Sequence, residues 1–107
     1  MRRSLAALLH DSHGFRGVPR SPAKPGHYAN YGLSPKQDAD LSGWMRRRLR
    51  LACWVKPDEC SIEQLALVER ELLARLLPPL NVKDVVTPWK SQIDAARRRM
   101  AAEARAA

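Results

Sequence analysis

The chain has little of what builds a large or a covalently cross-linked core. Its 107 residues include only three Trp, two Tyr, one Phe and two Cys. Cys53 and Cys60 form no CxxC or other metal-ligand pattern, which argues against zinc-finger and disulfide-scaffold proteins. No run of about 18 apolar residues occurs, so we expect no membrane-spanning helix. These absences predict one small cytoplasmic domain with a modest core and no membrane contact.

Positive charge dominates the sequence. Nineteen Lys and Arg residues against eleven Asp and Glu residues give a formal net charge of +8. Such an excess favours a partner that carries phosphate groups, and DNA is the partner that we expect. A GC-rich gene would also enrich arginine and alanine, so a charge without a binding role is the alternative. The candidate nucleic-acid contacts belong to two dense clusters: Arg46, Arg47, Arg48, Arg50, Arg97 and Arg98.

Helical patterns cover most of the chain. Apolar spacings of three and four residues predict four helices, over residues 2–10, 34–48, 61–77 and 88–106. Glycine and proline punctuate residues 11–35, so we expect a long loop there that adds little to the core. Weak alternation over residues 49–56 predicts a strand. Together these patterns predict an α+β, mostly helical fold with about four helices and one short strand.

One acidic residue interrupts the most regular of these helical patterns. The helix that ends before Pro78 has an apolar stripe that includes Ile62, Leu72 and Leu76, and Glu69 projects into the middle of this stripe. A carboxylate in such a place loses water, which is costly unless it is paired, protonated or bound to a cation. Glu69 is therefore either a cation ligand or a residue that reaches a basic neighbour at the rim of the stripe.

Five short motifs occur in order along the chain. They are NYG at 30–32, LSGWM at 41–45, the Glu69 helix, PPLN at 78–81 and TPW at 87–89. This ordered set resembles a bacterial branch of the GIY-YIG nuclease superfamily. The resemblance implies that Glu69 binds a divalent metal such as Mg²⁺, and that Asn81 belongs to the active-site set. It also implies metal-assisted hydrolysis of a phosphodiester bond in DNA.

The same resemblance indicates what is missing. The superfamily begins with two strand motifs that carry a tyrosine pair, followed by a helix with a catalytic arginine, and this sequence has no counterpart of either. Arg48 stands where the superfamily often has a histidine, and arginine cannot act as a base. We therefore expect a truncated GIY-YIG-like domain over residues 1–86, a basic helix over residues 87–107, and no activity in the chain as it stands.

Two alternatives without catalysis accompany this interpretation. One is a basic helical module that binds nucleic acid or a partner protein through its arginines and does not cleave nucleic acid. The other is a chain whose exposed apolar faces need a second copy or a partner chain, because unpaired strand edges and bare helix faces favour association. The first would be controlled by ionic strength and the second by protein concentration.

Overall fold

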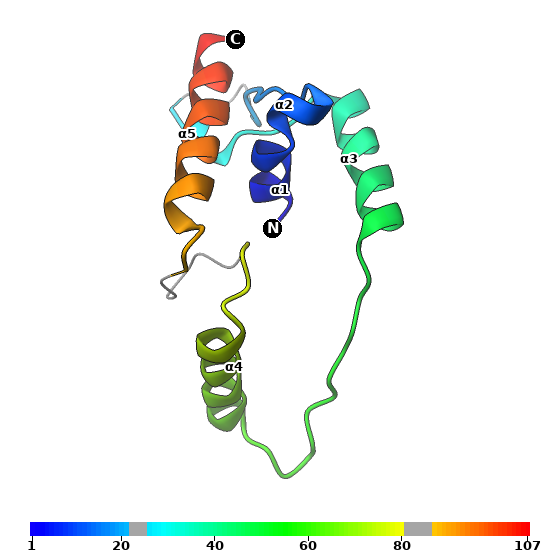
Figure 1. Ribbon diagram of the computed structural model, residues 1–107, viewed down its shortest axis with the longest axis vertical. Helices are drawn as coiled ribbons and strands as arrows, with labels where there is room; N and C mark the ends of the chain where they lie inside the picture. The colour runs from blue at the N-terminus through cyan, green and yellow to red at the C-terminus, as the bar shows by residue number, and fades with distance from the viewer. Residues whose placement is uncertain (22–25, 81–86) are drawn as a thin grey trace.

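The computed structural model describes residues 1–21, 26–80 and 87–107. Within these ranges the regular structure is helical, and the elements are α1 (Arg2–Leu8), α2 (His10–His13), the 3₁₀ turn η1 (Tyr28–Asn30), α3 (Pro35–Arg48), α4 (Ile62–Leu76) and α5 (Lys90–Ala106). Figure 1 shows α1 between α3 and α5, with α4 apart from them at the other end of the molecule. None of the described helices is both long and apolar enough to cross a membrane.

The molecule is less compact than a chain of its length usually is. The Cα radius of gyration is 16.4 Å, whereas a compact chain of this size has about 13 Å. The longest dimension is 50 Å and the other two are 30 and 29 Å. The difference arises because α4 buries none of its residues against the described part of the chain.

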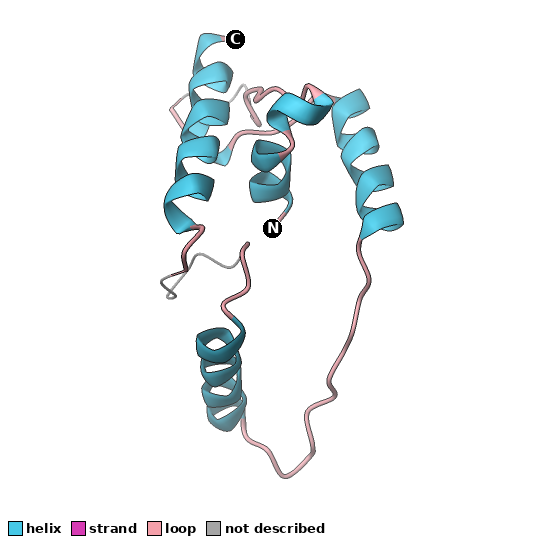
Figure 2. Cartoon of the chain, viewed as in Figure 1, coloured by secondary structure: helices cyan, strands magenta, loops and turns pink. Residues whose placement is uncertain are grey.

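The prediction of a short strand over residues 49–56 is wrong. These residues run as an extended connection (Figure 2), and Leu51 is 91% and Val55 84% exposed. The β pairing found among the described residues is a single antiparallel bridge between Val18 and Gly32. Alternating polarity does not suffice for a strand, because a strand also needs a partner for its backbone N–H and C=O groups. The described fold is therefore all-helical rather than α+β, with five α-helices rather than about four.

Local capping chemistry sets the helix starts. The Ser34 hydroxyl accepts a hydrogen bond from the Gln37 N–H at 3.3 Å and so caps α3. Ser61 and Gln64 form a reciprocal capping box at the start of α4, with bonds of 2.7 and 3.1 Å. Both starts match the predicted ones. The last helix begins at Lys90, two residues later than predicted.

The core combines apolar faces of the predicted helices with side chains that the sequence pattern does not single out. Its largest fully buried side chains are Phe15, Tyr31, Leu41, Ile93 and Met100. Phe15 and Tyr31 come from the segment 11–35, so the expectation that this loop adds little to the core is wrong. Small alanines on α1 and α5 are also almost completely buried, and they let the two helices approach each other closely.

The segment between α2 and α3 is held against the helices at several points. Val18 and Gly32 exchange two backbone hydrogen bonds, of 3.0 and 2.8 Å. The Tyr31 hydroxyl donates to a backbone carbonyl of α1 at 2.6 Å. Gly17 lies so close to α5 that a Cβ there would stand 2.0 Å from the Met100 carbonyl oxygen. Gly17, Val18, Tyr31 and Gly32 of this segment therefore belong to the packed part of the molecule.

Candidate functional site

Glu69 lies in the middle of α4, and its side chain is exposed. The apolar stripe around it is open as well, since Ile62 is 76% and Leu72 50% exposed. The expectation that this carboxylate has lost its water is therefore wrong for the described chain. An ion pair does form on α4, but it joins Glu71 to Arg75 at 2.7 Å and leaves Glu69 out.

Asn81, the second expected active-site residue, lies outside the described residues. The structure does show how α4 ends in front of it. Leu77 takes a left-handed conformation with φ 44° and ψ 56°, and Pro78 and Pro79 follow, which prevents the helix from continuing. The roles assigned to Glu69 and Asn81 stay predictions.

The surroundings of Glu69 decide which metal it suits. Within residues 1–21, 26–80 and 87–107, no three His, Cys, Asp or Glu side chains gather in a way that could hold a metal ion. A zinc site needs three or four protein ligands, and the described residues around Glu69 do not provide them. Mg²⁺ usually keeps several water ligands and binds proteins through one or two carboxylates. A single exposed carboxylate such as Glu69 fits a hydrated Mg²⁺.

The candidate arginines lie on two helices on either side of α1 (Figure 1). Arg46, Arg47 and Arg48 form the exposed last turn of α3, and Arg50 follows them in the connection. Figure 1 shows α4, which carries Glu69, apart from both helices. The structure therefore does not bring the expected metal ligand and the expected phosphate contacts together.

None of these arginines belongs to an ion pair among the described residues, although Arg97 and Arg98 lie close enough to Asp94 to help Lys90 lower its pKa. The ion pairs of the described residues use other cations: Arg2, His10, Arg16, Lys36, Arg75, Lys90 and Arg99. Arg98 is exposed on α5, and Arg97 is half-buried there. Guanidinium groups without acidic partners are available for bidentate contacts to phosphate.

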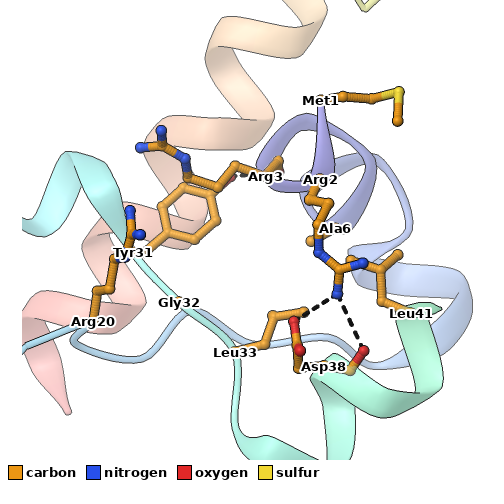
Figure 3. A pocket seen from close by; sticks show the side chains of 10 residues that line it. All are labelled: Met1, Arg2, Arg3, Ala6, Arg20, Tyr31, Gly32, Leu33, Asp38 and Leu41. Atoms are coloured by element: carbon orange, nitrogen blue, oxygen red, sulfur yellow. Dashed lines mark hydrogen bonds and ion pairs between the residues drawn. The ribbon is translucent and has the colours of Figure 1, made fainter.

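A cavity of about 480 Å³ opens beside α1. Arg2, Arg3 and Arg20 line it together with Tyr31 and Asp38 (Figure 3). Nothing in the sequence pattern points to this site, because its arginines are separated along the chain. The backbone bridge between Val18 and Gly32 places Arg20 next to Gly32, and only the fold makes that contact.

A second group without a signal in the sequence is a charged network around His10, which is 6% exposed. Its Nε2 lies 2.5 Å from Glu103 and its Nδ1 lies 2.7 Å from Asp11. The Gly17 N–H donates to the other oxygen of Glu103 at 3.0 Å. Burial alone would raise the pKa of the Glu103 carboxyl, but the hydrogen bonds from His10 and Gly17 lower this pKa below its usual value. The network joins α2, the following loop and α5, which indicates a structural role.

Comparison with protein families gives a match that covers nearly the whole chain. The family model described as the GIY-YIG catalytic domain matches residues 1–102. The curated proteins and the solved structures gave no match. The family match spans nearly all of the 107 residues and confirms the resemblance carried by the ordered motifs. The chain belongs to the GIY-YIG catalytic domain family.

Proposed function

We propose that this chain is a nuclease-like domain that binds DNA through arginines of α3 and α5 and does not cleave DNA by itself. The observation that carries the proposal is the GIY-YIG family match over residues 1–102, because this family implies a nucleic-acid substrate. The charge of +8 supports a polyanionic partner.

Glu69 is the residue that we assign to a divalent metal. When bound, Mg²⁺ supplies positive charge that stabilises a phosphate during hydrolysis. The Glu69 carboxylate offers a hard oxygen ligand on an exposed helix face, where a DNA backbone has access to it. We assign Asn81 to the local geometry after the proline-terminated end of α4.

The two tyrosines of the chain support the proposed lack of cleavage. Hydrolysis of this kind needs groups that activate water and neutralise charge beside the metal. Tyr31 is 2% exposed, and its hydroxyl already donates to the Arg3 carbonyl. Tyr28 packs under the guanidinium of Arg105, 5.5 Å from the ring centroid. Both tyrosines are thus committed to contacts with α1 and α5, whereas Glu69 is on α4.

A plasmid assay tests the proposed lack of activity. Supercoiled DNA is incubated with the chain and either Mg²⁺ or Mn²⁺, and nicking is followed on gels. We expect no nicking above the level of the Glu69→Ala variant. Glu63→Ala is the matched control, because Glu63 is exposed on the same helix but lies outside the stripe. Nicking that Glu69→Ala abolishes and Glu63→Ala preserves would show that the chain is active.

A salt titration tests the proposed DNA contacts. Each phosphate contact contributes about 0.9 to the slope of log affinity against log salt concentration. Replacing Arg46 and Arg47 together by alanine should therefore lower the slope by about 2. The control replaces Arg70 and Arg75 of α4, which removes the same charge from the other part of the molecule. Equal losses in the two double variants would contradict a DNA surface on α3.

The exposed face of α4 favours a second candidate function, association with a second copy of the chain. Ile62, Leu72 and Leu76 lie on this face and are each half or more exposed. An exposed apolar helix face of this kind is a usual site of protein contact. Sedimentation over a range of concentrations should show dimers for the native chain and monomers for Leu72→Glu. A native chain that stays monomeric at every concentration would rule this candidate out.

A further inference from the structure

We propose that the cavity beside α1 binds a nucleoside monophosphate, with Arg3 and Arg20 holding the phosphate. The ligand is either a free nucleotide or the 5′-terminal unit of a DNA strand. The second form rests on the DNA binding proposed above, and the first does not. The cavity has a volume of about 480 Å³, which is in the usual range for small-molecule sites, roughly 300–1,000 Å³.

Three arginines line this cavity, and they differ in whether an acidic side chain already neutralises them. Arg2 is already paired, because its guanidinium lies 2.6 Å from the Asp38 carboxylate and also donates to the Ser42 hydroxyl at 3.2 Å. Arg3 and Arg20 have no acidic partner within the part of the chain that the structure describes. Of the three arginines, two therefore offer their charge to a ligand.

The two available arginines turn toward the same wall. Figure 3 shows the guanidinium groups of Arg3 and Arg20 both at the Tyr31 side of the cavity, whereas Arg2 turns to Asp38 on the other side. Two cations at one wall repel each other, and a shared anion removes that repulsion. Guanidinium groups bind phosphate oxygens in a bidentate manner, so a phosphate is the anion that matches this pair.

Tyr31 fixes the geometry of this wall. Its hydroxyl donates to the Arg3 carbonyl at 2.6 Å, so the backbone that carries the Arg3 side chain is held in place. Arg3 also donates to the side-chain oxygen of Asn30. Burial raises the pKa of the Tyr31 phenol, while the nearby positive charges of Arg97 and Arg3 act in the opposite direction. The phenol therefore stays a neutral donor, and Arg97 adds a third cation behind the wall.

The rest of the cavity suits an organic group rather than a lone anion. Met1, which is 67% exposed, and the half-buried Leu33 supply accessible apolar wall, whereas Ala6 and Leu41 are almost completely buried. A phosphate ion would fill only a small part of a space of about 480 Å³. A nucleoside carried on the phosphate would cover the apolar wall, as ligands in mostly apolar pockets with few polar anchors do.

Calorimetric titration of the full chain with adenosine monophosphate (AMP), adenosine and inorganic phosphate tests the proposal. We expect AMP to bind most tightly, and Arg20→Ala to weaken AMP binding about tenfold or more, because a charge-assisted contact is lost. Arg20 is exposed, so its replacement should leave the circular dichroism spectrum unchanged. Arg70→Ala is the matched control, since Arg70 is an exposed arginine of α4 that does not line this cavity. Equal AMP affinities for the two variants would overturn the proposal, as would equal binding of AMP and inorganic phosphate.

Oligonucleotides separate the two sources of the ligand. Tighter binding of a 5′-phosphorylated single strand than of its 5′-hydroxyl form, lost in Arg20→Ala, supports the strand end. AMP binding without such a difference supports the free nucleotide. Failure of AMP to bind, with duplex DNA binding intact, contradicts only this inference. Failure of DNA binding, with AMP binding intact, contradicts only the proposed function.

Discussion

The packed part of the molecule and its arm, residues 49–80, differ in how much of their apolar surface is buried. The sequence pattern does not predict this difference. The packed part contains α1, α2, η1, α3 and α5, and it holds every buried hydrophobic residue of the described chain. The arm, residues 49–80, contains the helix with the cleanest apolar stripe, and no residue of that helix is buried. The short, alanine-containing α1 is buried over four consecutive residues.

This comparison separates helix formation from helix packing. α4 has a capping box at its start and an ion pair four residues apart near its end, and both are local interactions. Such interactions start and extend a helix, but most helical stability in proteins comes from packing of the apolar face. We therefore expect α4 to be the least stable helix of the chain, and the following changes test that contrast.

Gly17→Ala should have the largest effect. The new Cβ would stand 2.0 Å from a backbone oxygen of α5, and neither backbone can rotate away as a side chain would. We expect the free energy of unfolding to fall by about 3 kcal/mol or more, measured by urea denaturation. Gly32→Ala is the control, because its Cβ would meet only ordinary contacts at 3.6 Å or beyond. Similar stabilities of the two variants would place Gly17 away from α5.

Met100→Ala should destabilise the packed part by about 3 kcal/mol, because Met100 is 0% exposed and its removal leaves a cavity. Leu72→Ala in the arm should change stability by less than about 0.5 kcal/mol, since half of Leu72 is already in water. Hydrogen exchange of individual amides measures both effects and should show faster exchange in native α4 than in native α5. A large effect of Leu72→Ala would mean that the arm packs against something.

Stability should decrease in acid because of the network that joins α2 to α5. The Glu103 pKa is lower in the folded chain than its usual value of 4.5. A lowered carboxyl pKa stabilises the fold above the unfolded value and loses that contribution as the pH falls through the folded value. Unfolding free energy should therefore drop below about pH 4.5.

Glu103→Gln isolates this contribution. The variant should be less stable than the native chain at pH 7 and should show a shallower loss of stability in acid. Glu59→Gln, at an exposed position of the arm, serves as the control. An unchanged acid profile in Glu103→Gln would remove the network from the causes of acid sensitivity.

Glu69→Ala should have the smallest effect on stability. The side chain is exposed and the surrounding stripe is open, so the change should stay within about 0.5 kcal/mol in thermal unfolding. A carboxylate buried among leucines would behave differently, because its replacement by alanine would stabilise the chain. A stabilisation above about 1 kcal/mol would therefore indicate that α4 is covered in solution.

The sequence predicts the features that depend on neighbours along the chain. The caps at Ser34 and Ser61 gave the starts of two helices, and the ordered motifs gave the family. The alternation over residues 49–56 wrongly predicts a strand, because strand pairing depends on a partner elsewhere in the chain. The burial of Phe15 and Tyr31 was missed for the same reason, since both reach the core from a segment without periodicity.

The residues of the candidate sites also divide into those that the sequence predicts and those that only the fold brings together. Glu69 and the arginine clusters are visible in the sequence because each is a local irregularity or a local concentration of charge. The cavity with Arg3 and Arg20 is not, because these residues meet only after α1 packs beside the α2–α3 segment. Exposure of Glu69 likewise depends on what covers α4, which no pattern within α4 specifies.

The backbone bridge between Val18 and Gly32 has a consequence for how this chain tolerates change. Its two hydrogen bonds close the base of the segment that runs from Pro19 to Tyr31. Lengthening a closed loop costs little, because the entropy of closure grows only with the logarithm of loop length. The chain should therefore accept an insertion after the exposed Gly26 while the packed residues on either side, including Phe15, Tyr31 and the start of α3, keep their positions.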